Sequence, residues 1–304
     1  MPRRLLITGG SGLLGLNWAL AKRQEWEVTR VEHARQLQLS GTKAMQIDLS
    51  DTAAIRQGLE QAAPDLVVHT AGLTNVETCE ADPDLAMALN AQASGKIAET
   101  CARLGVPLVA ISTDHLFGKA PGPYTEASEQ TPLNVYAASK AAGERAIQEA
   151  FPKALVARTN FFGWGPSFKP SFSDVILHGL RSGQPLSLFD DVVFSPILME
   201  RLIEVAHRLV DQGAHGVFNL VGEETVTKHL FGCRLADHFG LPRELISAGK
   251  LSAKLDLVTR PHDMGLTTGK LRAALGEPVG DLDAFFSALK RAETAPLTQE
   301  IQAL

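Results

Sequence analysis

Cysteine is scarce in this 304-residue chain. Its three cysteines, Cys79, Cys101 and Cys233, are far apart in the sequence. An odd, widely spaced set predicts neither a disulfide framework nor a metal-binding knuckle. We therefore expect buried free thiols.

Motifs for metal and hydrolytic chemistry are also missing. The nine histidines include no His-Glu-x-x-His or other ligand spacing, so we expect no metal site. There is no Gly-x-Ser-x-Gly motif, which disfavours a serine hydrolase.

Strong charge and long apolar runs are lacking too. The net charge is −5 and no basic run is longer than Arg3-Arg4, so nucleic acid is not an expected partner. No apolar run approaches the roughly 20 residues needed to cross a bilayer, and we expect no membrane association. The first strand starts near residue 3 and leaves no room for a targeting peptide, which favours a cytoplasmic protein. A hydrophobic content of 45% predicts a sizeable core.

The most informative stretch lies near the start of the chain. An apolar strand over residues 4–8 runs into Gly9-Gly10-Ser11-Gly12-Leu13-Leu14-Gly15 and then into an amphipathic helix. In such a unit Gly9 permits a sharp turn, Gly12 lets a pyrophosphate approach the backbone, and Gly15 lets helix and strand pack closely. The helix N-terminus adds partial positive charge. The pattern predicts a dinucleotide-binding site.

The end of the second strand, about residues 26–31, selects between dinucleotides. Glu32 can accept a hydrogen bond from the ribose 2′-hydroxyl of NAD. Arg30, His33 or Arg35 could instead pair with the 2′-phosphate of NADP. These signals conflict, so we expect NAD or NADP and leave the choice open.

Three further strands, at about 44–47, 65–69 and 107–111, end in small or polar residues. The residues that follow them are Asp48-Leu49, Ala71-Gly72 and Ser112-Thr113-Asp114-His115. Continuous apolar strands are typical of parallel sheets covered on both faces, and doubly wound sheets bind ligands beyond their carboxyl ends. We therefore expect an α/β fold with a Rossmann-type doubly wound parallel sheet and a crevice at this edge.

Tyr136 and Lys140 lie four residues apart in a predicted helix, so they share one face. A phenol with a pKa near 10 is a poor proton donor and acceptor at neutral pH, whereas a neighbouring ammonium lowers that pKa. This pair is our candidate for proton transfer.

The chain resembles the extended branch of the short-chain dehydrogenase/reductase superfamily. The resemblance rests on four features in this order: the glycine turn, the strand end with small residues, the Ser/Thr after a later strand, and the helix with Tyr-x-x-x-Lys. Closer motifs resemble the dTDP-4-dehydrorhamnose reductase family. These motifs are Ser112-Thr113-Asp114-His115-Leu116-Phe117-Gly118, Pro123-Tyr124-Thr125-Glu126, Pro132-Leu133-Asn134-Val135-Tyr136, Arg158-Thr159-Asn160, Ser195-Pro196 and Arg260-Pro261 with Asp263. The resemblance covers about residues 3 to 275.

The resemblance implies that Thr113 hydrogen-bonds the substrate carbonyl, Tyr136 donates the proton, and Lys140 holds the nicotinamide ribose. It implies a set of cofactor-binding residues along the glycine turn and the strand ends. These are Gly9, Ser11, Gly12, Leu13, Leu14, Glu32, His33, Arg35, Asp48, Leu49, Ala71, Gly72, Tyr136 and Lys140.

The implied substrate residues are Thr74, Asp114, His115, Asn160 and Phe161. The sequence departs from the family in this region. His115 stands where the family usually has tyrosine, Gly118-Lys119 replaces Asp-Gly, and Phe161 stands where a sugar-stacking tryptophan is usual. The departures concern the sugar pocket, so reductase chemistry is better supported than a deoxysugar substrate.

We expect a NAD(P)-binding domain over residues 1–160 and a mainly substrate-binding lobe over 161–304, with some segments returning to the first domain. In the second half we expect a long loop at 160–172, a helix at 197–210, a strand at 216–221 in the main sheet or a small one, and a frayed tail after Arg291.

Together these features predict an NAD(P)-dependent reductase of a keto group on a nucleotide-sugar-like substrate, with a homodimer left open. Three alternatives remain: an epimerase or dehydratase of the same fold, a non-catalytic NAD(P)-binding regulatory subunit, and a dinucleotide sensor that acts through an oligomeric partner. The presence of Thr113, Tyr136 and Lys140 argues against the two non-catalytic alternatives, because binding alone does not require the phenol.

Overall fold

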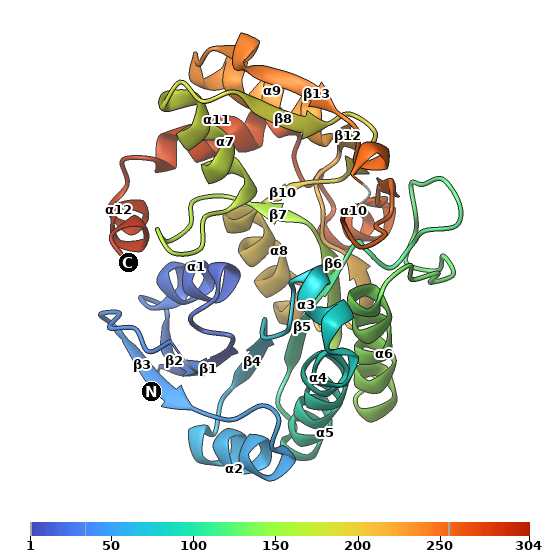
Figure 1. Ribbon diagram of the computed structural model, residues 1–304. Helices are drawn as coiled ribbons and strands as arrows, with labels where there is room; N and C mark the ends of the chain where they lie inside the picture. Colours follow the sequence, from blue (N-terminus) through green and yellow to red (C-terminus); the bar gives the residue numbers. More distant parts are fainter. Residues whose placement is uncertain (1, 34, 255) are drawn as a thin grey trace.

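The computed structural model describes residues 2–33, 35–254 and 256–304. Its main element is a seven-stranded sheet in which all neighbouring strands are parallel (Figure 1). In spatial order the strands are β11 (Gly216–Asn219), β6 (Leu155–Thr159), β5 (Leu108–Thr113), β4 (Leu66–His69), β1 (Arg3–Thr8), β2 (Trp26–Glu32) and β3 (Thr42–Gln46). The predicted doubly wound parallel sheet is confirmed.

The order of strands reverses beside β1. The chain runs outward from β1 to β2 and β3, and then crosses back so that β4 pairs with the other edge of β1. Such a switch point leaves a crevice outside the carboxyl ends of the strands, where ligands of doubly wound proteins bind.

Alternate residues of the strands face opposite layers of helices. Leu6 of β1 packs into the core with α2 (Thr52–Ala62), α5 (Ala93–Leu104) and α6 (Val135–Ala150). Its neighbours Leu5 and Ile7 face the core that contains α1 (Leu13–Lys22) and α8 (Met199–Asp211). Burial on both faces explains why these strands are continuously apolar.

A π-helix interrupts the helical segment that follows β4. The chain forms α3 (Val76–Ala81), α4 (Pro83–Met87), a π-helix η1 (Ala88–Gln92) and then α5. The wider turn lets Asn90 accept from Leu73 N at 2.8 Å and donate to Leu73 O and Ser139 Oγ, both at 2.9 Å. Asn90 therefore binds backbone beside the crevice and joins three segments of the chain.

The remaining elements form smaller layers beyond the sheet (Figure 1). They are β7 (Phe161–Phe162), α7 (Phe172–Arg181), β8 (Leu186–Phe189), β9 (Val193–Phe194), β10 (Ile197–Leu198), β12 (Val226–Thr227), α9 (Lys228–Phe239), η2 (Arg243–Leu245), β13 (Ile246–Gly249), η3 (Leu251–Ala253), β14 (Asp263–Met264), α10 (Gly269–Leu275), α11 (Leu282–Ala292) and α12 (Pro296–Gln302). β10 pairs with β7, β13 with β8, and β9 with both β12 and β14. β11 is the segment that returns to the main sheet, while the division at residue 160 stays a prediction.

Two boundaries in this half differ from expectation. The expected loop at 160–172 contains the strand β7, and the helix expected from residue 197 starts at Met199 because Ile197–Leu198 pairs with β7. Pairing satisfies the backbone of a segment whose Phe162 is buried, and a buried backbone without partners would be unfavourable.

The tail expected to fray after Arg291 instead ends in helix α12, so that prediction is wrong. α12 lies beside α1 (Figure 1). Ile301 is buried in the core, and Glu300 forms a bidentate pair with Arg23, both contacts being 2.6 Å. A single buried apolar side chain and one ion pair with α1 keep the terminus ordered.

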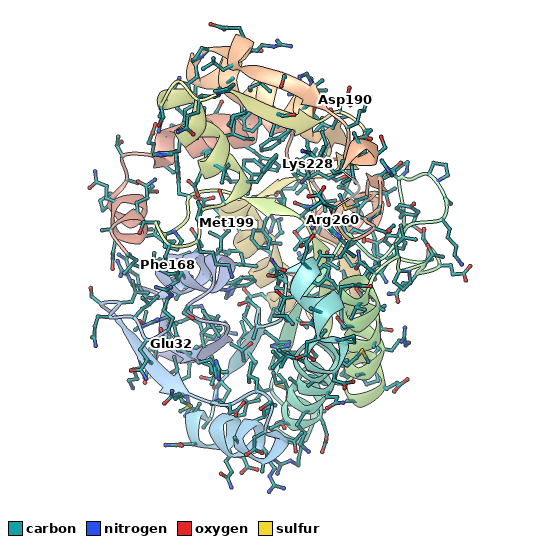
Figure 2. All side chains as sticks on the ribbon, in the orientation of Figure 1. Glu32, Phe168, Asp190, Met199, Lys228 and Arg260 are labelled. Atoms are coloured by element: carbon teal, nitrogen blue, oxygen red, sulfur yellow. The ribbon has the colours of Figure 1, made fainter. Side chains whose placement is uncertain are left out.

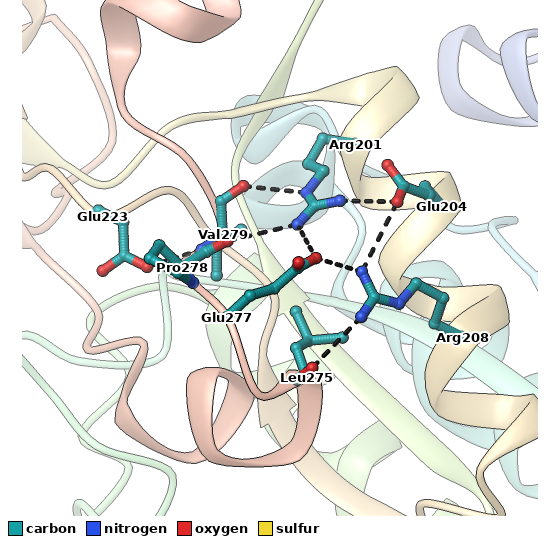
Figure 3. Close-up of polar contacts among 8 residues, drawn as sticks. All are labelled: Arg201, Glu204, Arg208, Glu223, Leu275, Glu277, Pro278 and Val279. Atoms are coloured by element: carbon teal, nitrogen blue, oxygen red, sulfur yellow. Dashed lines mark hydrogen bonds and ion pairs between the residues drawn. The ribbon is translucent and has the colours of Figure 1, made fainter.

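A cluster of ion pairs attaches the segment after α10 to helix α8 (Figure 3). Arg201 donates to Glu204 Oε1 at 2.7 Å, to Glu277 Oε1 at 3.1 Å and to Val279 O at 2.9 Å. Arg208 also donates to Glu277. The contacts connect parts of the chain about 70 residues apart.

In the described part of the chain, no helix combines the length and apolar character needed to span a bilayer. Among the same residues, no three His, Cys, Asp or Glu side chains gather as metal ligands could. All three cysteines are buried and free.

Candidate active site

A cavity of about 980 Å³ lies outside the carboxyl ends of β1, β4 and β5. With the exception of Arg30, the residues that the sequence assigned to cofactor, substrate or proton transfer line it. These residues are Gly9, Ser11, Gly12, Leu13, Leu14, Glu32, His33, Arg35, Asp48, Leu49, Ala71, Gly72, Thr74, Thr113, Asp114, His115, Tyr136, Lys140, Asn160 and Phe161. The structure brings them together, and their individual roles stay predictions.

The glycine turn forms one wall of the cavity. Gly9 has φ +69°, a conformation that favours glycine, and Gly12 N donates to Gly9 O at 2.8 Å. A side chain at Gly15 would come within 2.3 Å of Gly9 O, so helix and turn pack as the spacing predicts. Helix α1 begins at Leu13 with no side chain capping its first N–H groups. Those groups suit the pyrophosphate of a dinucleotide.

Arg30 does not line the cavity, in contrast to the expectation that it could contact a 2′-phosphate. Its guanidinium donates to Glu32 Oε1, to Leu37 O at 2.9 Å and to Thr42 Oγ1 at 2.9 Å. Burial and three partners hold it away from the crevice.

Arg35 instead reaches the cavity from the loop after β2. Its guanidinium lies 3.9 Å from the centre of the Phe168 ring, a cation–π contact with the loop between β7 and α7. Figure 2 shows Phe168 above Glu32 at this side of the molecule. Lys169 and His33 line the same cavity, so basic residues gather at the side where the adenosine half of a dinucleotide is predicted to lie.

Helix α6 positions Tyr136 and Lys140. Asn134 caps the helix by accepting from Ala137 N at 2.8 Å, which places Tyr136 in the first turn and Lys140 in the second. Lys140 Nζ donates to Ile111 O at 2.8 Å, at the end of β5. Both side chains therefore face the same cavity as Thr113.

The two groups titrate differently from the sequence-based expectation. Burial raises the pKa of Tyr136 to about 12, and the nearby Thr113 hydroxyl acts against this. Burial lowers the pKa of Lys140 to about 8, while Glu144 opposes that change. The expected lowering of the phenol pKa by Lys140 is therefore wrong here, because burial dominates. The Tyr136 phenol is therefore neutral at neutral pH.

A short polar network lies at the end of the cavity where the substrate residues are predicted. Asp114 accepts from Asn160 Nδ2 at 2.7 Å and from Thr113 Oγ1 at 3.4 Å. His115 N donates to Thr113 Oγ1 at 3.2 Å. The network orients the Thr113 hydroxyl, the group predicted to meet the substrate carbonyl.

The His115 ring packs edge to face with Tyr136, with ring centres 5.6 Å apart. Burial lowers the pKa of His115, with Asp114 opposing and Lys228 and Arg260 adding to the change. Its Nδ1 is buried and, among the described residues, has no hydrogen-bond partner. The His115 imidazole is therefore neutral, with one ring nitrogen unpaired among the described residues.

The sequence did not assign several other lining residues, among them Ser112, Thr159, Phe168, Lys169 and Arg260. Arg260 donates to Glu77, and its Nε is buried with no partner among the described residues. The motif Arg260-Pro261 was the signal that could have identified it. No motif in the sequence marks Phe168 or Lys169, because only the folded loop between β7 and α7 brings them to the cavity.

The fold is doubly wound and of the Rossmann type, with an uncapped helix after the glycine turn. One cavity also brings together Thr113, Tyr136 and Lys140. These features define a protein of the short-chain dehydrogenase/reductase type. The family model described as the RmlD substrate binding domain matches residues 3–291. The chain therefore belongs to this family, and the resemblance drawn from its motifs is confirmed.

Relatives within the family have different activities. The dTDP-4-dehydrorhamnose reductase of Mycobacterium tuberculosis is 32% identical, over 74% of this chain and 72% of that protein. The methionine adenosyltransferase 2 subunit beta of Rattus norvegicus is 30% identical, over 79% of this chain and 73% of that protein. The crystal structure of dTDP-4-dehydrorhamnose reductase from Bacillus anthracis in complex with NADP has a TM-score of 0.83 at 20% identity, covering 96% of this chain and 99% of that one. At that identity, the structural likeness establishes the fold.

Proposed function

We propose that this protein is an NAD(P)H-dependent reductase of a keto group on a nucleotide-sugar-like substrate. The observation that carries the proposal is the convergence of Thr113, neutral Tyr136 and Lys140 on the cavity that the glycine turn also lines. The reductase of Mycobacterium tuberculosis and the NADP complex from Bacillus anthracis support it.

The residues of the cavity fit a nicotinamide dinucleotide. Gly9, Gly12 and the start of α1 would hold the pyrophosphate, and Lys140 the nicotinamide ribose. When bound, the reduced cofactor supplies a hydride to the carbonyl carbon.

The chain supplies the proton and the orientation. Thr113 Oγ1 donates a hydrogen bond to the carbonyl oxygen of the substrate, and Tyr136 transfers its Oη proton to that oxygen. The product is a hydroxyl, and the phenolate left behind lies beside the Lys140 ammonium. A raised pKa suits this direction, since it keeps the donor protonated until negative charge develops on the oxygen.

A regulatory role is the second candidate, because of the likeness to a methionine adenosyltransferase subunit beta. An epimerase or dehydratase of the same fold would re-use its cofactor. We place the reductase in the cytoplasm, consistent with three free thiols, and leave a homodimer open.

Cofactor stoichiometry separates these functions. Purified protein is incubated with NADH or NADPH and a panel of keto nucleotide-sugars, and loss of the reduced nicotinamide is followed with product analysis. A reductase consumes one cofactor per hydroxyl formed. Product formation without net consumption would indicate an epimerase or dehydratase, and binding without turnover of any panel member would support the regulatory role.

A further inference from the structure

Two cavities share a wall at Lys140. The main cavity lies on one side, and a second cavity of about 10 Å³ lies on the other. Ile111, Ser112 and Lys140 line both. The small cavity also contains Glu144, one helical turn beyond Lys140 on α6. Glu144 therefore lies behind the ammonium that faces the main cavity.

The Glu144 side chain is 3% exposed, and both oxygens of its carboxylate accept hydrogen bonds. Arg158 on β6 donates to its two oxygens at 3.0 Å and 2.7 Å, and Gln130 donates at 2.6 Å. A buried ion pair adds little to the stability of the fold, because the cost of removing two charges from water offsets their attraction. An effect of the carboxylate on nearby Lys140 would explain why an acid occupies this position.

Lys140 has few groups that can balance its charge. Its hydrogen-bond acceptor, Ile111 O, is neutral. The titratable groups that face it are Tyr136 and Glu144 on its own helix and His69 on β4, with Arg158 behind Glu144. Burial lowers the pKa of His69 to about 3, so this ring is neutral. Among these described groups, Glu144 carries the negative charge.

We propose that Glu144 is a positioning residue whose carboxylate keeps the Lys140 ammonium charged and holds it at the shared wall, beside Ile111 O and within reach of the main cavity. The small cavity has room for one water, and the buried Ser112 Oγ, which has no partner among the described residues, can bind it. Such a water would join Lys140 to the carboxylate. The inference rests on the proposed function, in which Lys140 holds a nicotinamide ribose.

Titration of the Lys140 side chain in the full chain without cofactor tests the proposal. Lysine side-chain NMR, with the signal assigned by its loss in Lys140→Arg, reports the pKa directly. Glu144→Gln keeps the shape and removes the charge, and we expect it to lower the pKa of Lys140 from about 8 by roughly one pH unit. Glu144→Asp keeps a carboxylate, so the pKa of Lys140 should stay close to that of the unsubstituted protein.

Arg158→Gln is the matched control, because it breaks the same ion pair from the other side. It leaves Glu144 unneutralised, so the pKa of Lys140 should rise. If the ion pair were purely structural, both variants would be less stable, but the pKa of Lys140 would not fall in one and rise in the other. If either single variant fails to fold, Glu144→Gln combined with Arg158→Gln removes both buried charges, and a lowered pKa of Lys140 is again expected.

Cofactor affinity gives a second readout. Near pH 8, NADH should bind Glu144→Gln roughly fivefold more weakly than the unsubstituted protein, measured by nicotinamide fluorescence without substrate. A Lys140 titration unchanged in the variants would overturn the inference. Lack of reductase activity would contradict the proposed function instead, and would not alter the titration.

Discussion

Arg30 and Glu32, two residues apart on β2, form an ion pair whose side chains are only 1% and 2% exposed. The pair also organises the loop after β2: Glu32 Oε2 accepts from Leu37 N at 3.2 Å, and Arg30 donates to Leu37 O at 2.9 Å. Glu32 reaches the main cavity with one carboxylate oxygen already paired to Arg30. This arrangement bears on cofactor choice.

We expect both NADH and NADPH to bind, with a modest preference that these side chains control. Arg35→Ala should weaken NADPH binding by about tenfold and NADH binding little, because one charge-assisted contact to the 2′-phosphate is lost. Glu32→Gln should weaken NADH binding more than NADPH binding. The glutamine keeps an oxygen that can accept a hydrogen bond from buried Arg30, which alanine would remove, although both substitutions remove the opposite charge.

Fluorescence titration of both cofactors checks this, with Arg56→Ala as the control. Arg56 is an exposed arginine on α2 that does not line the cavity. A strict preference for one cofactor that neither substitution changes would mean that neither residue reads the 2′ position.

Tyr136→Phe should reduce turnover by about a hundredfold or more while cofactor still binds, since the change removes the proton donor and little volume. Lys140→Met should weaken both cofactor binding and turnover. Steady-state rates and separate cofactor titrations distinguish the two effects. Wild-type turnover by Tyr136→Phe would show that another group donates the proton.

The protein should be poor on dTDP-4-dehydrorhamnose and better on another polar cyclic keto ligand. The ring of His115, which stands in place of the usual tyrosine, packs edge to face on Tyr136, and Phe161 offers apolar area without an indole donor. Thermal-shift screening of nucleotide-sugars with cofactor present would identify candidates. Turnover assays then compare them with dTDP-4-dehydrorhamnose.

His115→Tyr combined with Phe161→Trp should raise activity on dTDP-4-dehydrorhamnose, whereas His115→Ala should impair activity on the preferred ligand. Efficient use of dTDP-4-dehydrorhamnose that is unaffected by His115→Ala would refute this account of the pocket.

Acid should loosen the contact between α1 and α8 through one histidine. Trp18 Nε1 donates to His207 Nε2 at 2.9 Å, which requires a neutral ring, and burial lowers the pKa of His207 to about 4. Because the folded-state pKa lies below the ordinary 6.5, the stabilisation is fully present above about pH 6.5 and is lost as pH falls through about 4.

Urea unfolding at several pH values checks this prediction. We expect His207→Gln, which does not titrate, to show a smaller loss of unfolding free energy between about pH 6.5 and 4. An equal loss in both proteins would place the acid sensitivity elsewhere, for example at buried His69.

The sequence by itself determined the features that depend on local chain geometry. Glycine spacing between a strand and a helix predicts the turn at Gly9, and a four-residue interval on a helix places Tyr136 and Lys140 on one face. Parallel strands bring their carboxyl ends to one edge, so Ala71 and Thr113 could be assigned to the same crevice from the order of elements alone.

Only the tertiary structure decided what depends on burial and on distant partners. The phenol of Tyr136 has a raised pKa because residues from other elements exclude water from it, an effect that outweighs the opposing hydrogen bond from Thr113. The hydrogen-bond partners of Arg30 come from β2, β3 and the loop between them. Phe168 contacts Arg35, which lies more than a hundred residues earlier in the sequence. The helix α12 is ordered by its contacts with α1. Desolvation and long-range packing are properties of the assembled fold, and no local pattern in the sequence encodes them.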